Sequence, residues 1–361
     1  MIFGYSIFVL SLNLILYLVL WILYKFNFRS YSTHNDTLPK VSILIAVRNE
    51  EHNIPKLLEG LTNQYYPKEK IQILIGNDGS EDQSLDLLMR AANDQIQIVD
   101  IRDQVSGLQG KMNVLAQLAK LAKGQLLLYT DADMRLNPKW IEGMVSSVHT
   151  NPGLVGGFTS IQPDNYFLAL QNVDLHFGQG MLKVLSDLGI GISVLGNNML
   201  VIKSKLDESG GYEGLDFSVV EDVSLLKRLT ESGHKAILSY NVSTHISTIG
   251  ESSWRLLMNQ RLRWTDGFKL TPIWLKLITL LKFSFLPALI YLVNQNPIFI
   301  LGLVLKVVLS LLFITEIERS VKSKNSVFII LLYEIFESIL YYSTLICSVL
   351  PIKINWKGRE Y

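Results

Sequence analysis

The sequence predicts an α/β domain with a mostly parallel central sheet, preceded and followed along the chain by hydrophobic helices. Three observations predict this fold class. Short apolar runs of strand type alternate with helical apolar stripes between residues 41 and 130. An apolar segment without a charged residue precedes this block, at 2–24. Three further apolar stretches come near the end of the chain, at about 272–293, 297–315 and 326–350.

The composition limits the classes of function. The chain has 361 residues, of which 49% are hydrophobic, and a formal net charge of +1. Its mean hydropathy of +0.27 is high for a purely soluble protein. The net charge gives no argument for nucleic acid as a partner. The single cysteine, Cys347, lies in an apolar stretch, so no internal disulfide can form and the soluble part suits a reducing compartment.

The first apolar segment is predicted to be a retained membrane anchor. Residues 2–24 are long enough to cross a hydrocarbon core of about 30 Å. A cleaved signal peptide is the alternative, but the segment lacks a basic n-region and a small-residue cleavage site. Lys25 and Arg29 follow directly, so the positive-inside rule places the next residues in the cytosol.

The block from residue 41 reads as strands and helices in alternation. Strands are expected at 41–47, 71–76, 96–101 and 125–130, and helical stripes at 54–61, 85–92 and 115–122. This alternation implies a parallel sheet with helices on both faces. After about residue 135 the pattern becomes irregular.

In such a sheet the loops that lead from strand to helix gather at one edge. Three of them, 48–51, 77–80 and 131–133, carry polar side chains. Strand alternation is expected to point Asp131 and Asp133 to the same side. Two carboxylates at this edge suit a divalent cation that also holds a diphosphate. Ordinary helix N-caps are the alternative, most of all for Asn49 and Ser80.

Two later positions also carry charge at the start of a helix. Lys111 opens the third helix after a glycine-containing loop, where it is placed to reach a phosphate or a ribose. A solvated surface lysine is equally consistent with this position. Glu221 and Asp222 begin a further helical stripe, where the helix dipole favours anions. A plain helix-start acid is again equally consistent.

Residues 252–270 are predicted to form an amphipathic helix at the membrane interface. Their apolar side chains span an arc of roughly 160°, with basic residues elsewhere on the helix; the arc contains Trp254, Leu257, Met258, Leu262, Trp264 and Phe268. Arg261 falls inside the arc, so we expect it to face protein or ligand and not lipid.

The three C-terminal apolar stretches contain charged residues. These are Lys276 and Lys282 in the first, Lys306 in the second, and Glu334 and Glu337 in the third. Positive-inside counting places both the expected 316–324 loop and the basic tail in the cytosol. Three complete crossings after a cytosolic domain would put the tail outside. We therefore expect one stretch to be interfacial or re-entrant, either the first or the glutamate-bearing last one.

Taken together, these motifs resemble the membrane-anchored inverting glycosyltransferases of family 2, which have the Rossmann-like GT-A fold. The resemblance covers about residues 40–265 and rests on the order and spacing of residues 41–51, Asn77-Asp78-Gly79-Ser80, Gly110-Lys111-Met112-Asn113, Asp131-Ala132-Asp133, Gly196-Asn197-Asn198, Glu221-Asp222 and Gln260-Arg261-Leu262-Arg263-Trp264. The final residues, Trp356-Lys357-Gly358-Arg359-Glu360-Tyr361, are similar to the end of bacterial members that glycosylate lipids, such as carotenoid and hopanoid-associated transferases. Asn77 stands where many members carry Asp, but the neighbouring Asp78 keeps the carboxylate.

The resemblance implies a role for each motif residue. Asp222 would be the general base, and Asp133 would ligate Mg²⁺ or Mn²⁺ bridging the diphosphate. Asp131 would contact the ribose or a metal-bound water. The other residues implied at the nucleotide sugar are Ala46, Arg48, Glu50, Asp78, Lys111 and Ala132. Those implied at the diphosphate and the acceptor are Glu221, Gln260, Arg263 and Trp264.

The expected organisation is a GT-A nucleotide-sugar-binding domain with N-terminal and C-terminal transmembrane helices. Its parts are an anchor (1–27), a cytosolic glycosyltransferase domain (28–250), the interface helix (251–271), a membrane region of two to three helices (272–350) and a basic tail (351–361). The expected location is the bacterial inner (plasma) membrane, crossed more than once.

The expected activity is metal-assisted, inverting transfer of a sugar from a UDP- or GDP-linked donor to a lipid hydroxyl. Nucleic acid is not an expected partner. A processive polysaccharide synthase of the same family is an alternative, because the Gln-x-x-Arg-Trp signature occurs in both. A non-catalytic membrane protein that binds nucleotide sugars is another. A transporter or structural membrane protein would not need a soluble block with converging carboxylates.

Overall fold

The computed structural model describes residues 1–31, 38–105, 107–350, 355–356 and 359–360. The chain divides into two compact units. The sheet unit comprises Arg29–Ile161, Leu185–Ile249 and Asn355–Tyr361, and the helical unit comprises Met1–Phe28, Gln162–Val184 and Gly250–Ile354. Residues 162–184 thus fall into the helical unit, whereas the sequence places them inside the 28–250 domain.

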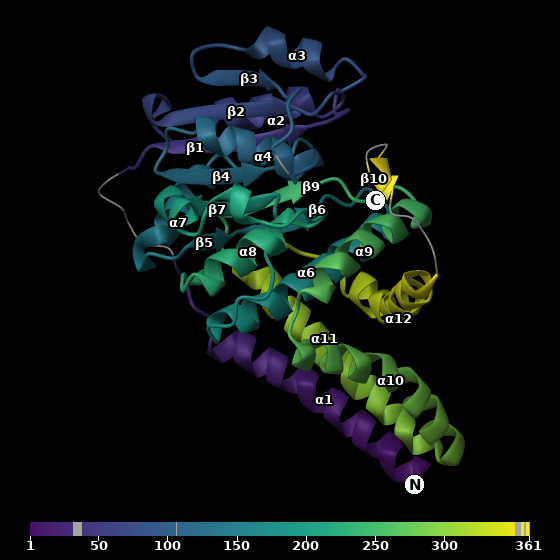
Figure 1. Cartoon of the computed structure of the whole chain (residues 1–361). Coiled ribbons are helices and arrows are strands. Elements are labelled where there is room, and N and C mark those ends of the chain that lie inside the picture. Colours follow the sequence, from purple (N-terminus) through teal and green to yellow (C-terminus); the bar gives the residue numbers. More distant parts are fainter. Residues whose placement is uncertain (32–37, 106, 351–354, 357–358, 361) are drawn as a thin grey trace. The chain divides into compact units, whose positions relative to one another are not determined.

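The sheet unit is built on a seven-stranded sheet with the order β3-β2-β1-β4-β7-β5-β8 (Figure 1). β1 pairs in parallel with β2 and β4, β2 with β3, and β5 with β8, while β7 is antiparallel to β4 and β5. The mostly parallel sheet is therefore confirmed. The strands are β1 (Val41–Val47), β2 (Ile71–Asn77), β3 (Ile96–Asp100), β4 (Leu126–Thr130), β5 (Leu154–Gly156), β7 (Asn198–Ile202) and β8 (Ala236–Leu238).

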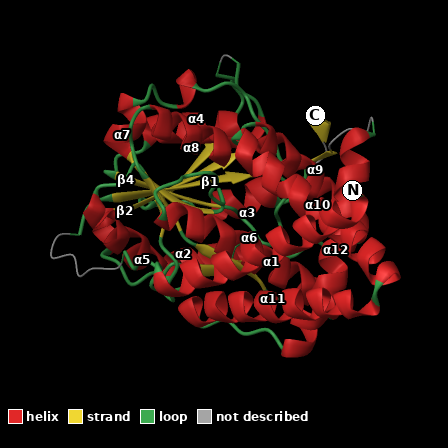
Figure 2. Cartoon of the chain, turned by 90° about the horizontal axis from the view of Figure 1, so that it is seen from below, coloured by secondary structure: helices red, strands yellow, loops and turns green. Residues whose placement is uncertain are grey.

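Helices cover both faces of this sheet, as Figure 2 shows. α2 (Ile54–Thr62), α3 (Ser84–Ala91) and α5 (Trp140–Ser146) share one core cluster with Ile43, Ile45 and Ile75. Gly76 alternates with Ile75 and faces the other side. There a Cβ on Gly76 would lie 2.3 Å from Val114 Cγ1 of α4 (Gly110–Leu121), so the glycine allows α4 to approach β2 closely.

The carboxyl ends of the parallel strands meet at one edge of the sheet. In the register of β1, β2 and β3, Val47 lies opposite Asn77, and Asn77 lies opposite Asp100. β4 runs parallel beside β1. The loops 48–51, 77–80 and 131–133 therefore leave the sheet at the same edge, as predicted.

The rest of the sheet unit was not predicted in detail. β6 (Phe158–Ile161) and β9 (His245–Thr248) form a parallel pair, and α7 (Lys203–Glu208) and α8 (Glu221–Glu231) follow β7 along the chain. The short 3-10 helices of the unit are Lys68–Lys70, Ser147–Thr150 and Tyr212–Gly214. In the tail, β10 (Asn355–Trp356) pairs with β11 (Arg359–Glu360), and the other tail residues of the lipid-transferase resemblance, 357–358 and 361, lie outside the described residues.

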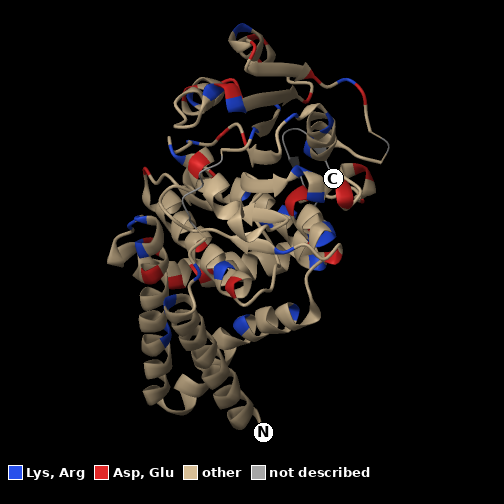
Figure 3. Cartoon of the chain, turned by 90° about the vertical axis from the view of Figure 1, so that its left-hand side faces the viewer, with Lys and Arg blue, Asp and Glu red and all other residues tan. Residues whose placement is uncertain are grey.

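Within the described residues, the helical unit contains four helices long and apolar enough to cross a membrane. They are α1 (Ile2–Phe26), α10 (Ile273–Gln295), α11 (Ile300–Val321, after the short 3-10 helix Pro297–Phe299) and α12 (Val327–Val349). α1 packs along α10 and α11, and Figure 3 shows how few charged residues these long helices carry. α12 packs on α9 (Trp254–Lys269) and on α11. The interfacial placement of one C-terminal stretch stays a prediction.

Two elements of the helical unit differ from the sequence expectation. The loop expected at 316–324 begins later, because α11 continues to Val321 with an ion pair between Glu316 and Arg319 one turn apart. The helix α6 (Tyr166–Asp187) was not predicted at all. It has no simple apolar stripe, because its buried side chains are largely polar; they include Gln171, Asn172, Asp174, His176, Gln179 and Lys183.

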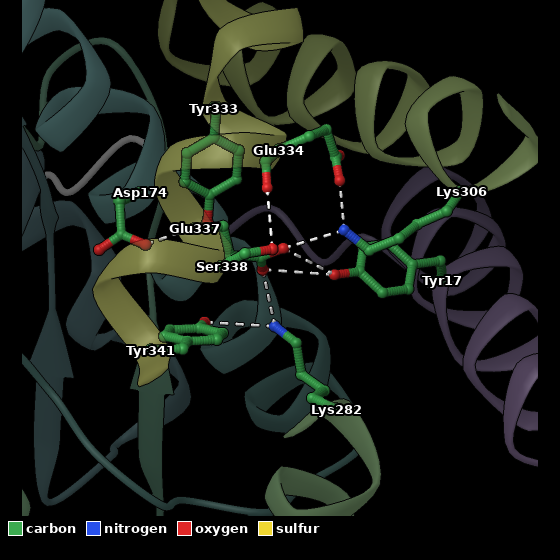
Figure 4. Close-up of polar contacts among 9 residues, drawn as sticks. All are labelled: Tyr17, Asp174, Lys282, Lys306, Tyr333, Glu334, Glu337, Ser338 and Tyr341. Atoms are coloured by element: carbon green, nitrogen blue, oxygen red, sulfur yellow. Dashed lines mark hydrogen bonds and ion pairs between the residues drawn. The ribbon is translucent and has the colours of Figure 1, made fainter. Parts of the chain in front are cut away.

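Four charged residues of the long helices, Lys282, Lys306, Glu334 and Glu337, form one network (Figure 4). Glu337 accepts hydrogen bonds from Lys282 Nζ and Lys306 Nζ, each at 3.0 Å, and from the Tyr17 hydroxyl at 3.3 Å. Lys306 also pairs with Glu334. Two ammonium groups and two carboxylates balance in charge, which is how charges inside apolar helices are usually tolerated. This network connects α1, α10, α11 and α12.

Gly76→Ala should destabilise the sheet unit, because the added methyl group overlaps Val114 and pushes α4 away from β2. Overpacking of this kind costs about 1–3 kcal/mol of the free energy of unfolding. The measurement is thermal unfolding of the purified protein in detergent. Gly178→Ala is the control, because a Cβ there meets nothing within 4 Å. Equal unfolding temperatures for Gly76→Ala and the unchanged protein would contradict the close packing.

Candidate functional site

Lys111 joins two carboxylates at the edge where the parallel strands end. Its Nζ lies 2.7 Å from Asp131 Oδ1 and 2.7 Å from Glu221 Oε1, and the Lys111 side chain is 12% exposed. Burial by itself lowers the pKa of Lys111, but the two carboxylates outweigh burial and hold this pKa above its usual range. Lys111 is therefore a fixed positive charge that ties α4 to the loop after β4 and to the start of α8.

Asp222, next to Glu221, is held by two backbone N–H groups. Its Oδ2 accepts a hydrogen bond from the Gly196 N–H at 2.7 Å, and its Oδ1 accepts one from the Val223 N–H at 2.8 Å. Burial, and after it the negative charge of Glu221, raises the pKa of Asp222 to about 6, although Lys111 and both N–H groups oppose this shift. A carboxylate with this pKa is ionised at neutral pH and can accept a proton there.

The two aspartates of the Asp-x-Asp motif have different partners. Lys111 binds Asp131, whereas Asp133 Oδ2 accepts a hydrogen bond from Thr248 Oγ1 at 2.7 Å. β4 ends at Thr130, so both aspartates lie in the turn that follows. Strand alternation therefore does not set their direction, and that part of the sequence argument was wrong. Ala132 between them is buried in the core of the sheet unit.

The loops after β1 and β2 are tied to each other. Arg48 Nη1 donates to the carbonyl oxygens of Asp78 at 2.6 Å and of Gly79 at 3.0 Å. The Asp78 N–H donates to the Val47 carbonyl at 2.8 Å. Arg48 and the buried Asp78 are therefore neighbours, as the resemblance implies.

Two further residues of the predicted nucleotide pocket belong to β1 and its loop. Glu50 Oε2 accepts a hydrogen bond from Asn53 Nδ2 at 2.7 Å. Ala46 pairs with Gly76 across β1 and β2. The nucleotide-binding roles of these residues stay predictions.

Lys111, Asp131, Glu221 and Asp222 thus form one cluster: Lys111 contacts Asp131 and Glu221, and Asp222 follows Glu221 in the chain. Glu221 was predicted to act at the diphosphate or acceptor; in the structure its carboxylate pairs with Lys111.

Gln260, Arg263 and Trp264 lie on α9 of the helical unit. Gln260 Nε2 donates to Glu251 Oε1 at 3.0 Å. Arg261 pairs with Asp174 at 2.8 Å, so it contacts protein, as its place in the apolar arc predicts.

The sequence did not reveal two groups that hold the acidic residues. Thr248 lies on β9, far along the chain from Asp133, and no local pattern marks it. The Gly196 N–H belongs to a turn within the Gly196-Asn197-Asn198 motif, and the sequence argument assigned that motif no contact with Asp222. That turn is anchored by Asn198, which accepts a hydrogen bond from Trp140 Nε1 at 2.9 Å and donates to the carbonyls of Phe158 and Thr244 at 2.9 and 3.0 Å. Long-range contacts of this kind leave no periodic signal.

The donor atoms of Asp131 and Asp133 fit a hard divalent cation. Among the described residues, no three His, Cys, Asp or Glu side chains gather into a metal-ligand group. Mg²⁺ commonly takes one or two protein carboxylates and completes its shell with substrate phosphates and water. The assignment of Asp133 as the direct ligand stays a prediction from the resemblance.

Comparisons with known proteins identify the family and the fold of the chain. The model of glycosyl transferase family 21 matches residues 6–361, whereas the motifs by themselves resemble family 2. A solved structure of the mannosyltransferase PcManGT from Pyrobaculum calidifontis, in complex with GDP-Man and Mn²⁺, is similar with a TM-score of 0.63 and 13% identity. The similarity covers 97% of this chain and 99% of that chain, and it confirms the predicted fold class.

Several curated proteins are also similar in sequence. Glycosyltransferase AglE of Haloferax volcanii is 29% identical over 57% of this chain and 66% of its own length. A beta-monoglucosyldiacylglycerol synthase of Trichormus variabilis is 26% identical over 64% of this chain and 49% of its own length. A poly-beta-1,6-N-acetyl-D-glucosamine synthase of Staphylococcus aureus is 25% identical over 64% and 55%. The chain thus spans about half to two thirds of the length of these relatives.

Asp133→Ala should remove the metal-dependent part of nucleotide binding, because it deletes the carboxylate that is predicted to ligate the cation. We expect the affinity for UDP or GDP with Mn²⁺ to fall more than about tenfold, the scale seen when support of a metal site is lost. Calorimetric titration with and without EDTA measures this. Asp207→Ala, at a side chain 59% exposed, is the control. If EDTA changes the nucleotide affinity of neither the Asp133→Ala variant nor the Asp207→Ala control, the metal assignment is wrong.

Proposed function

The chain belongs to glycosyl transferase family 21, and from this premise we propose that it moves one sugar from a nucleoside-diphosphate sugar to a lipid hydroxyl with inversion. The observation that carries the proposal is the arrangement around Asp222. A carboxylate with a pKa of about 6 lies beside Glu221, which is joined through Lys111 to Asp131. A group that accepts a proton therefore lies in one cluster with a candidate donor-binding residue.

In the proposed reaction, the acceptor hydroxyl oxygen attacks C1 of the sugar from the face opposite the diphosphate. Its proton passes to the carboxylate of Asp222, which later releases it to water. The bond between C1 and the diphosphate oxygen breaks, and the diphosphate keeps the electron pair. One displacement without an enzyme nucleophile inverts the configuration at C1.

The chain's own residues prepare this step. Lys111 keeps Asp222 ionised by lowering its pKa and neutralises Asp131 and Glu221. Asp78 and Arg48 bind the nucleotide together with Ala46, Glu50, Asp131 and Ala132. A bound Mg²⁺ or Mn²⁺, held by Asp133, would offset negative charge on the diphosphate. On the acceptor and diphosphate side we assign Glu221, Gln260, Arg263 and Trp264.

A lipid acceptor is supported by the helices and by one relative. In the part of the chain that the structure describes, four helices have the length and composition to cross a membrane. The helix α9 combines Trp254 and Trp264 with basic residues. The relative from Trichormus variabilis is named as a beta-monoglucosyldiacylglycerol synthase. Lys25 in the last turn of α1 and Arg29 after this helix favour a catalytic domain on the cytosolic face of a bacterial inner membrane.

Polymer synthesis is the second candidate, since another relative is named as a polysaccharide synthase. A polymer channel usually needs more crossings than the four candidate helices of the described residues provide. A non-catalytic nucleotide-sugar-binding protein is the third candidate, and the filled acidic positions of the site argue against it.

The pH dependence tests the base. With the pKa of Asp222 near 6, kcat/KM should fall as the pH drops below about 6, because the protonated carboxyl cannot accept a proton. Asp222→Asn should lower kcat by about 10²–10⁴-fold and leave nucleotide affinity nearly unchanged. Asp216→Asn, at an exposed aspartate of the preceding loop, is the matched control. Turnover of Asp222→Asn with the original pH profile would exclude Asp222 as the base.

The product tests the acceptor class. The membrane-embedded protein is incubated with a panel of radiolabelled nucleotide sugars and extracted lipids. A product that partitions into organic solvent is the expected result. Label in a polymer insoluble in both phases would favour the polysaccharide synthase, and donor binding without any product would favour the non-catalytic protein.

A further inference from the structure

One face of α6 carries two buried polar side chains toward the segment that contains the Gln-x-x-Arg-Trp residues. Gln171 is 1% exposed and Asp174 is 8% exposed. They are three positions apart on the helix, so they share a face. Both belong to the helical unit, as do Glu251 and α9.

Gln171 fixes the chain just before α9. Its Nε2 donates to the Glu251 carbonyl at 2.9 Å, and its Oε1 accepts from the Glu251 N–H at 2.9 Å. Both polar atoms of one amide are thus used on one peptide segment, which leaves little freedom for the Glu251 backbone. The Glu251 side chain in turn accepts from Gln260 Nε2 at 3.0 Å. Gln171 therefore fixes the position of the Gln260 side chain through Glu251.

Asp174 fixes the adjacent residue of α9. Its Oδ2 lies 2.8 Å from Arg261 Nη2. Its Oδ1 accepts a hydrogen bond from the Tyr333 hydroxyl at 3.0 Å, which Figure 4 shows. The Arg261 guanidinium lies 4.2 Å from the centre of the Trp264 ring. Because the guanidinium is planar, fixing its direction also fixes the plane on which the indole stacks. α12 contributes to this arrangement through Tyr333.

These side chains are not what a simple packing face would contain. Burial raises the pKa of Asp174, and the charge of Arg261 and the Tyr333 hydroxyl oppose that shift. Well-packed apolar residues at such positions would avoid the desolvation of a charged pair. The polar groups of α6 therefore do not increase the apolar area that is buried. Instead, each of them fixes the orientation of one side chain of the motif.

We propose that Gln171 and Asp174 are positioning residues for the Gln-x-x-Arg-Trp motif, acting on Gln260 through Glu251 and on Trp264 through Arg261. The importance of the motif for transfer rests on the proposed function. The orientation of Trp264 does not, and it can be measured without any activity.

Asp174→Asn tests the proposal with little change in shape. The acceptor KM should rise, or kcat should fall, by about tenfold as Trp264 loses its fixed position, while the donor KM stays within about twofold. Asp164→Asn, at an exposed aspartate before α6, should leave both unchanged. Equal loss for donor and acceptor together with a lower unfolding temperature would show a merely structural role and overturn the proposal. Tyr333→Phe is the milder second variant if Asp174→Asn fails to fold.

A double-mutant cycle asks whether Asp174 acts through Trp264. In the Trp264→Phe background, Asp174→Asn should cause little further loss of kcat/KM for the acceptor. If the two substitutions act independently, their effects on kcat/KM multiply, and this result would overturn the proposal.

Fluorescence gives the readout that needs no activity. The Trp264 signal is the difference between the protein and its Trp264→Phe variant, and acrylamide should quench it more strongly after Asp174→Asn. Unchanged quenching overturns the positioning role. Changed quenching in a protein that transfers no sugar supports the positioning role and contradicts only the proposed function.

Discussion

The ion pairs of Lys111 with Asp131 and Glu221 are the interaction on which the candidate site depends. One ammonium group holds the start of α4, the turn after β4 and the start of α8 at a common point. Removing one partner of a buried ion pair typically costs about 3–5 kcal/mol, because the remaining charge loses its compensation. Here the remaining charges would be the carboxylates of Asp131 and of Glu221, and Glu221 is the neighbour of Asp222. Lys111 therefore controls both the geometry and the electrostatics of the proposed base.

The periodic part of the fold could be predicted from the sequence. β1 to β4 and the three polar loops at their carboxyl ends follow from strand and helix periodicity and from the geometry of parallel sheets. The acidic pair after β4 could be found but not oriented, because the strand ends at Thr130. Thr248 and the Gly196 N–H could not be found, since tertiary contacts alone bring them to Asp133 and Asp222.

The helical unit shows the opposite relation between sequence pattern and structure. Lys282, Lys306, Glu334 and Glu337 looked like defects in apolar stretches, but in the structure they pair with one another. α6 was missed because its buried positions are polar where a prediction looks for an apolar stripe. Two of these polar residues, Gln171 and Asp174, contact the motif segment. Buried polar side chains that break a local pattern are therefore informative about how this unit holds α9.

The measurement that tests the account most directly is the pH profile of kcat/KM for Lys111→Met beside the unchanged protein. In the unchanged protein the acidic limb should lie near pH 6, where Asp222 titrates. Without the positive charge of Lys111, burial and Glu221 raise the pKa of Asp222 further, so the limb should move to higher pH. Lys111→Arg, which keeps the charge, should leave the limb near its original place. A Lys111→Met protein that loses activity but keeps its acidic limb at the original pH would contradict the account.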